Sequence, residues 1–140
     1  MLPSDPYTAV QAIDHLSVVC CDLAVRPLGT KIINEGRRGH VVIPGNNFAD
    51  YVFFIGGLFG RYGSGDLTVM LALLRLFETV VEVLPPGSPR LSVLNRAAGE
   101  ALADPERSMP RPPSLERVRA AVAALRSKIN SKATPAVTGA

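Results

Sequence analysis

The stretch DLTVMLALLRLFETVVEVL, residues 66–84, decides the fold. If it is helical, its few polar side chains fall on one narrow stripe and every other position is apolar. The polar stripe consists of Thr68, Arg75, Glu78, Thr79 and Glu82. Such a pattern is typical of the central helix of a bundle with one edge exposed. We therefore predict a helix over 66–84, with Ser64 or Gly65 at its start and Pro85-Pro86 at its end.

A second helix is predicted upstream, over 47–62, because Asn46 or Asn47 can cap it and its apolar residues recur with helical spacing. Gly56, Gly57 and Gly60 share another side of this helix, which indicates that something approaches that side closely. Gly56 and Gly60 are therefore candidate interface residues. The approaching element is either a partner helix in a GxxxG contact or another helix of the same domain.

The N-terminal segment predicts a helix over 6–25, with Ser4 or Asp5 as its cap, Pro6 at its first position and Pro27 after its end. Its predicted core face consists of Val10, Ile13, Leu16, Cys20, Leu23 and Ala24. Asp14 lies at the edge of that face.

Two short β-branched runs follow, Lys31–Ile33 and Val41–Ile43, on either side of the polar turn Asn34–His40. This pattern predicts a β-hairpin between the first two helices. A lone two-stranded hairpin is marginally stable, so we expect it to lean on helices.

The C-terminal half predicts a helix over 89–103, begun by Ser88 and Pro89, then a Pro-rich linker over 104–114. A last helix over 115–129, capped by Ser114, and a mobile polar tail over 130–140 complete the chain. The predicted fold class is mainly α: about five helices in a bundle-like single domain, residues 1–129, with the small hairpin between helices one and two.

Composition excludes several classes of protein. The 140 residues are 47% hydrophobic and 19% charged, with a mean hydropathy of +0.21, so the chain has ample material for one core. A net charge of +3 without any Trp does not favour nucleic-acid binding. No signal peptide is expected, because Asp5 and Gln11 interrupt the opening residues.

The chemistry-bearing residues predict neither an enzyme nor a metal or cofactor site. Cys20 and Cys21 are adjacent, which favours a reducing compartment, and the two histidines have no zinc-ligand spacing. His15 and Cys20 project about 140° apart on one helix and cannot form a local dyad. The glycines of RYGSGD, residues 61–66, follow a helix and do not form a phosphate-binding motif.

Charge is distributed unevenly along the chain. Residues 90–132 carry +5, whereas residues 1–89 carry −2. Arg119 and Arg126 flank the apolar stripe of the last helix. They predict either a basic amphipathic helix that contacts anionic lipid or an acidic partner, or an ordinary solvated helix face.

The segment DPYTAVQAIDHLSVV with RPLG after it, FADYVFFIGGLFGRYG and TVMLALLRLFETV together resemble the C-terminal region of a bacterial family of predicted membrane proteins, domain-of-unknown-function family 2254. The resemblance spans about residues 5–125. Its opening motif is carried by Asp5, Pro6, Thr8, Asp14 and, beside them, Ala9 and Leu16. Family members typically carry transmembrane helices upstream, so this chain is expected to be either an excised domain or a short gene product.

The resemblance implies a location in the cytoplasm, at the inner face of the plasma membrane, and no reaction. We therefore expect a non-enzymatic accessory, regulatory or assembly domain. Its partner would be a second copy, with a dimer as the first expectation, a membrane protein, or an anionic lipid surface. The docking surface is expected on helix two or helix five. The alternative is a ligand-binding or enzymatic domain with a pocket around Asp5, Thr8 and Asp14.

Overall fold

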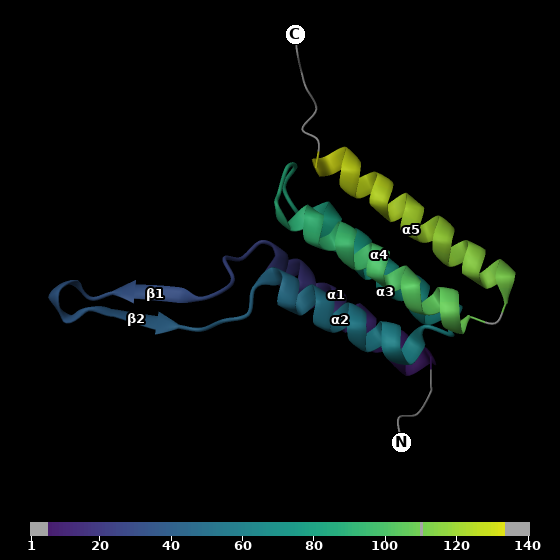
Figure 1. Cartoon of the computed structure of the whole chain (residues 1–140), viewed down its shortest axis with the longest axis horizontal. Helices are drawn as coiled ribbons and strands as arrows, with labels where there is room; N and C mark the ends of the chain where they lie inside the picture. The colour runs from purple at the N-terminus through teal and green to yellow at the C-terminus, as the bar shows by residue number, and fades with distance from the viewer. Residues whose placement is uncertain (1–5, 110, 134–140) are drawn as a thin grey trace, which may run out of the picture.

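The computed structural model describes residues 6–109 and 111–133. In this part of the chain it contains five α-helices and one antiparallel two-stranded hairpin, and so confirms the predicted fold class (Figure 1). In chain order the elements are α1 (Pro6–Ala24), β1 (Lys31–Asn34), β2 (His40–Ile43), α2 (Phe48–Gly63), α3 (Leu67–Val83), α4 (Arg90–Ser108) and α5 (Pro112–Ala133).

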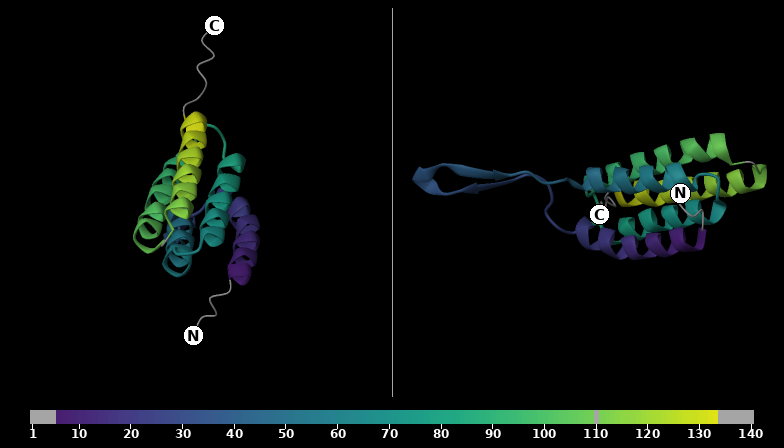
Figure 2. Two further views of the ribbon diagram at one scale, coloured as in Figure 1. Left: turned by 90° about the vertical axis from the view of Figure 1, so that its right-hand side faces the viewer. Right: turned by 90° about the horizontal axis from the view of Figure 1, so that it is seen from below.

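Helix α3 lies at the centre of the helical body, as its sequence predicts. It packs against each of the other four helices, and α2, α3, α4 and α5 form a four-helix bundle with α1 on the outside, against α3 (Figure 2). Nine side chains of α3 are buried: Val69, Met70, Ala72, Leu73, Leu74, Leu76, Phe77, Val80 and Val81.

Asn47 caps α2, which settles the choice between the two adjacent asparagines. The Asn47 side chain accepts a hydrogen bond from the Asp50 backbone N–H at 2.9 Å, and the Asp50 carboxylate accepts one from the Asn47 N–H at 2.9 Å. Two backbone donors that the helix leaves unpaired are thereby satisfied reciprocally.

The start predicted for α3 is wrong by one or two residues. Asp66, rather than Ser64 or Gly65, is the cap, and its carboxylate accepts a hydrogen bond from the Val69 N–H at 3.1 Å. Ser64 instead terminates α2 and is buried, because the connection is a tight turn in which the Asp66 N–H donates to the Gly63 carbonyl at 2.9 Å.

The Pro-rich linker predicted over 104–114 is also wrong, since α4 continues to Ser108 and α5 begins at Pro112, before Ser114. Two of its prolines, Pro105 and Pro112, lie within these helices. Pro112 is the first residue of α5, where a missing N–H costs nothing. Pro105 is buried in the last turns of α4, and its carbonyl accepts a hydrogen bond from the Met109 N–H at 2.9 Å.

The last helix extends beyond its predicted end. Buried Ile129 and the carbonyl contacts of Lys132 hold its last turns against the bundle, so residues 130–133 are helical and not part of a tail. The remainder of the predicted mobile tail, 134–140, lies outside the described residues.

The hairpin does not lean on helices. Residues 31–43, called the arm here, project from the end of the bundle as a narrow shaft, and all eight strand residues are exposed (Figures 1 and 2). The strands pair in the register Ile33 opposite Val41 and Asn34 opposite His40, with a turn of 3₁₀-helix at the tip. The connectors carry the arm past the ends of α1 and α2, so the bundle does not cover it.

Two glycines bring the connectors together at the base of the arm. The Gly29 N–H donates to the Asn46 carbonyl at 3.1 Å, and Gly29 has a φ of 103°, a conformation that favours glycine. A Cβ atom on Gly45 would lie only 2.7 Å from the Gly29 carbonyl oxygen. Both positions therefore need glycine for the two connectors to lie this close.

Replacing the cap of α3 tests this account. We expect Asp66→Ala to lower the free energy of unfolding by about 1 kcal/mol, because it leaves the Val69 N–H without its partner. Urea denaturation monitored by circular dichroism measures the loss. Thr68→Ala, an exposed position in the first turn of α3, is the control and should change stability by less than about 0.5 kcal/mol. Equal losses in both variants would contradict the assignment.

Candidate functional site

The predicted family-motif residues do not converge on a deep cleft. Asp5 lies outside the described residues, and Pro6, Thr8 and Asp14 are all exposed on α1. Asp14 lines a hollow between α1 and α3, with Arg75 of α3 on the other side. The volume of this hollow, about 220 Å³, is below the roughly 300 Å³ at which ligand pockets begin.

Gly56 and Gly60 of α2 face other helices of the same chain, whereas Gly57 is exposed. Gly60 is buried, and a Cβ on Gly56 would lie 3.5 Å from the ring of Phe77 on α3. Gly56, Gly57 and Gly60 also line a small hollow of about 160 Å³ against Ala97 and Ala101 of α4. Of the two interpretations of this glycine face, the structure therefore shows the helix crossing inside the domain.

The basic residues predicted to flank the last helix are engaged with α4. Arg119 pairs with Glu116 at 2.7 Å and with Glu106 of α4 at 3.6 Å. Arg126 packs over Gly99 and donates to the Asn95 carbonyl at 3.4 Å. The apolar stripe between them is buried in the bundle, which leaves α5 without the free apolar face that a docking helix needs.

Other cations of α5 fasten it to α3. Lys128 forms an ion pair and hydrogen bond with Glu78, and this hydrogen bond is the main reason that the pKa of Lys128 is raised. Lys132 donates to the carbonyls of Val81 and Glu82 at 2.7 and 2.8 Å. A positive charge is thereby placed at the C-terminus of α3, the negative end of its dipole.

Arg90 holds three helices together at the base of the arm. From the start of α4 its guanidinium donates to the Leu23 and Ala24 carbonyls at 3.2 and 2.8 Å, at the C-terminus of α1. The same group lies 5.2 Å from the centre of the Phe48 ring at the start of α2. A hollow of about 470 Å³ opens beside it, lined by Val25, Arg26 and Pro85 among others.

Arg90 is not among the residues that the sequence pattern singled out, although its position at the start of a helix is a signal. A cation in the first turn of a helix is unfavourable for the helix dipole. Its presence there indicates a compensating partner elsewhere, and that partner is the C-terminus of another helix.

The two cysteines form no disulfide, and their thiols have low reactivity at neutral pH. Burial raises the pKa of the Cys20 thiol to about 11, and burial also raises the pKa of Cys21. Neither is therefore an activated nucleophile at neutral pH. Within residues 6–109 and 111–133, no group of three or more His, Cys, Asp or Glu residues is placed to hold a metal ion.

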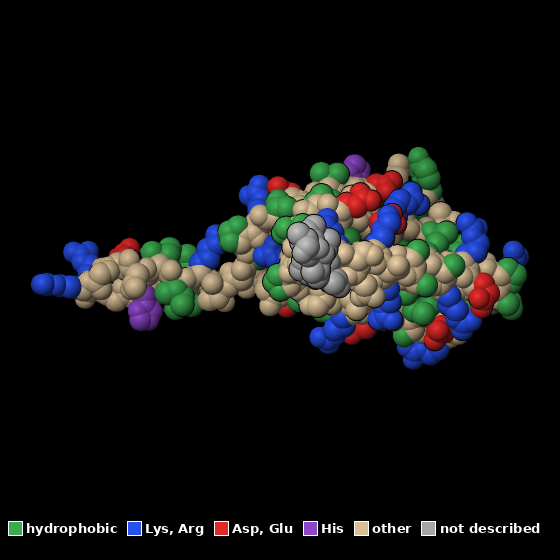
Figure 3. Space-filling view, turned by 90° about the horizontal axis from the view of Figure 1, so that it is seen from above, with side chains coloured by type: hydrophobic (Ala, Val, Ile, Leu, Met, Phe, Trp, Pro, Cys, Tyr) green, Lys and Arg blue, Asp and Glu red, His purple; other side chains and the backbone are tan. Residues whose placement is uncertain are grey.

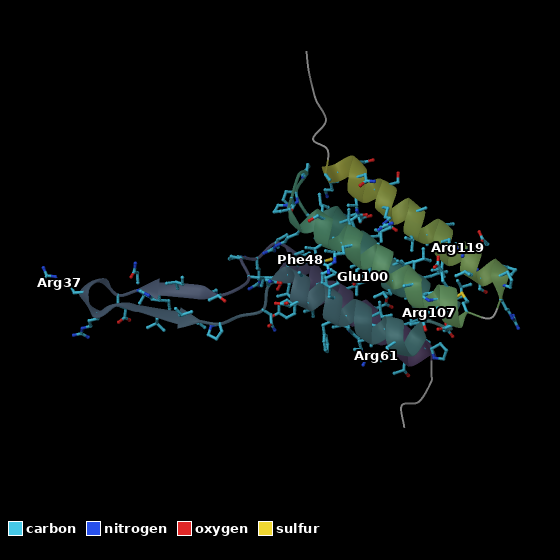
Figure 4. The ribbon with its side chains drawn as sticks, in the orientation of Figure 1. Arg37, Phe48, Arg61, Glu100, Arg107 and Arg119 are labelled. Carbon is cyan, nitrogen blue, oxygen red and sulfur yellow. The ribbon has the colours of Figure 1, made fainter. Side chains whose placement is uncertain are left out.

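The arm carries the most concentrated apolar surface of the described chain. The described residues include twelve large hydrophobic residues that are exposed. Five of these lie on the strands of the arm, with exposed fractions of 44–67%. These are Ile32, Ile33, Val41, Val42 and Ile43. Figure 3 shows hydrophobic side chains along the shaft and basic ones at its end, and Figure 4 places Arg37 at the tip, far from the labelled residues of the bundle.

Comparisons with known proteins place the chain in a family. The family model described as "Predicted membrane protein (DUF2254)" matches residues 4–79, which is more than half of the chain. The chain belongs to the DUF2254 family of predicted membrane proteins. The match covers α1, the arm, α2 and most of α3, so the arm lies within it.

The relatives are mycobacterial proteins described as uncharacterized. One protein of Mycobacterium bovis and one from each of two strains of Mycobacterium tuberculosis are 35% identical to this chain over 97 residues. The aligned region is 68% of this chain but only 18% of the length of these relatives. No solved structure matches. None of the helices in the described residues is both long and apolar enough to cross a membrane.

Arg90 and Arg96 form a matched pair for a stability test. Each lies over a phenylalanine of α2, but Arg96 is exposed and its ion pair is with Glu100, on its own helix. We expect Arg90→Met to lower the free energy of unfolding by about 1–3 kcal/mol, because two carbonyls lose a charged donor. Arg96→Met should cost less than about 1 kcal/mol. Thermal unfolding of both variants measures the difference, and a reversed order would refute the role of Arg90.

The buried thiol predicts a decline of stability in alkali. Between about pH 9 and pH 11 the Cys20 thiol ionises in the unfolded chain but stays protonated in the fold, so the free energy of unfolding falls as the pH rises. Urea midpoints across this range measure the slope. Cys20→Ala should flatten it more than Cys21→Ala, because Cys21 is less buried. The same slope in all three proteins would show that other groups cause the decline.

Proposed function

We propose that this chain is a non-enzymatic assembly domain of a DUF2254 protein, which docks through its arm at the cytoplasmic face of the plasma membrane. The observation that carries the proposal is the arm itself. A two-stranded hairpin is marginal on its own, and three or more strands with an apolar face are needed for independent stability. An arm with β-branched residues on both faces therefore calls for a partner.

The proposed docking surface is the arm, in place of helix two or helix five, where the sequence predicted it. The apolar residues of α5 are inside the bundle, and α2 contributes Phe54 and Leu58 as its large exposed hydrophobic residues. Phe54 is 70% exposed and remains a secondary contact on the same domain. The five exposed apolar residues of the arm cluster on one small sheet, with Ile33, Val41 and Ile43 on one face and Ile32 and Val42 on the other. Such a cluster suits a protein partner better than isolated side chains do.

The proposed cytoplasmic location is supported by the cysteines and the family. Cys20 and Cys21 are free thiols, as expected in a reducing compartment, and the family is one of predicted membrane proteins. The rival function, a pocket around Asp5, Thr8 and Asp14, receives less support. Asp14 is exposed beside a shallow hollow, and the mechanism of an acid or base needs a second group aimed at the same point.

A variant with a polar arm tests the proposal. We expect the wild-type domain to associate at micromolar concentrations in sedimentation velocity. Replacing the five arm residues Ile32, Ile33, Val41, Val42 and Ile43 by Thr should abolish association, because Thr keeps the strand preference but removes the apolar surface. Phe54→Thr, which removes a large exposed side chain from α2, is the control and should leave most of the association intact.

The bundle provides an internal check on folding. Since the arm residues are exposed, the polar variant should keep the helical circular dichroism and the melting temperature of the wild type. A wild-type domain that stays monomeric and shows no partner at the arm would contradict the proposal.

A further inference from the structure

We propose that the partner of the arm is a second copy of this chain, and that the two β1 strands pair edge to edge in an antiparallel register centred on Ile33. This inference rests on the proposed assembly function and names its partner and its geometry. The result would be a four-stranded sheet shared by two domains, with a two-fold axis at Ile33. Four observations lead to this register.

The first observation is which residues of β1 have free backbone groups. The Glu35 N–H donates to the Gly39 carbonyl at 3.0 Å, across the hairpin. Because hydrogen-bonded pairs alternate along an antiparallel ladder, residues 31, 33 and 35 direct their backbone groups towards β2. Ile32 and Asn34 consequently direct theirs outward, where the outer edge of β1 is open to another strand.

The second observation is that these outward groups limit which residues of two β1 strands can form hydrogen-bonded pairs with each other. Two β1 strands can form hydrogen-bonded pairs only between their outward residues, 32 and 34. Centring the pair on Ile33 places Ile32 of one copy opposite the partner's Asn34, and Asn34 opposite the partner's Ile32. All the outward groups of both strands are then used, and the interface is self-complementary, as a two-fold contact requires.

The third observation is charge complementarity. The same register places Lys31 opposite the partner's Glu35, and Glu35 opposite the partner's Lys31, in pairs where side chains approach most closely. Neither residue has an ion pair among the described residues. The outer edge of β2 offers no such match, because its charged and titratable residues are Arg38 and His40, without an acid.

The fourth observation is the apolar face. Lys31 and Ile33 lie on one face of the hairpin, together with Val41 and Ile43. Glu35 follows the strand directly and continues this alternation, since its N–H still bonds across the hairpin to Gly39. In the paired sheet Ile33 meets the partner's Ile33 at the centre, and the valine and isoleucine of each β2 extend the apolar surface on both sides. The two helical bundles lie at opposite ends of the shared sheet, which the projection of the arm allows (Figure 2).

Charge reversal tests the pairing directly. Lys31→Glu alone, or Glu35→Lys alone, creates two like-charged pairs in each dimer, and we expect either change to raise the dissociation constant about tenfold or more. The double variant Lys31→Glu with Glu35→Lys should restore it to within about threefold of the wild type. Arg37→Glu, at the tip and outside the pairing, is the matched control and should change it less than either single reversal. Sedimentation equilibrium measures all five proteins.

Disulfide trapping tests the register. With Cys20→Ala and Cys21→Ser removing the native thiols, Ile33→Cys should give a covalent dimer with oxidised glutathione as the oxidant, because the two residues face each other across the axis. Val41→Cys lies on the same face but one strand further from the axis, and should not form it. Circular dichroism of each variant confirms that the bundle is folded.

The outcomes separate this inference from the function on which it rests. Association that is lost in the polar-arm variant, but is insensitive to charge reversal and is not trapped by Ile33→Cys, would overturn the β1 register and leave the assembly function standing. Binding of a monomeric domain to vesicles of phosphatidylcholine and phosphatidylglycerol, lost equally in Lys31→Glu and Arg37→Glu, would overturn the second copy in favour of a lipid surface. Rescue by the double variant supports the proposal.

Discussion

The burial of α3 is the constraint on which the rest of the structure depends. A helix that is apolar on all but one stripe has to be enclosed, and here four other helices enclose it. Its single polar stripe also decides where α5 lies, because Glu78 and Glu82 of that stripe meet Lys128. One segment of sequence thereby sets both the centre of the core and a line of contact at its boundary.

Two cations satisfy carbonyl groups at the C-terminal ends of helices in the bundle. Arg90 neutralises the C-terminal carbonyls of α1, and Lys132 does the same for α3. Each cation comes from a helix far away in the sequence, so each contact joins two distant segments of the chain. Each also gives a hydrogen-bond donor to carbonyls that the helix end leaves unpaired. Arg90 lies where α1 stops and the connector to the arm begins, and it therefore fixes the base from which the arm projects.

Sequence reasoning succeeded where the signal was local. The span of α3, an asparagine cap for α2 at position 46 or 47 and the strands of the hairpin follow from periodicity and from single residues. It failed where burial or turn geometry overrides a residue's own preference. Buried Pro105 lies within a helix that the proline content argued against, and Asp66 caps α3 in place of Ser64 or Gly65 because the connection from α2 is a tight turn. Less of the candidate site could be predicted from the sequence. The exposure of the arm and the hydrogen bond from Arg90 to the Ala24 carbonyl both depend on how the helices pack in three dimensions.

The pair of glycines at the base of the arm has an evolutionary consequence. Because Gly29 and Gly45 hold the two connectors together outside the bundle, side chains on the strands can be exchanged without disturbing the packing around Phe77. Selection on the strands is thereby decoupled from selection on the core. With the arm as the proposed contact between copies, gene duplicates in one cell can diverge in strand sequence, so that each product recognises its own kind and ignores its paralogue, while all of them keep the same fold.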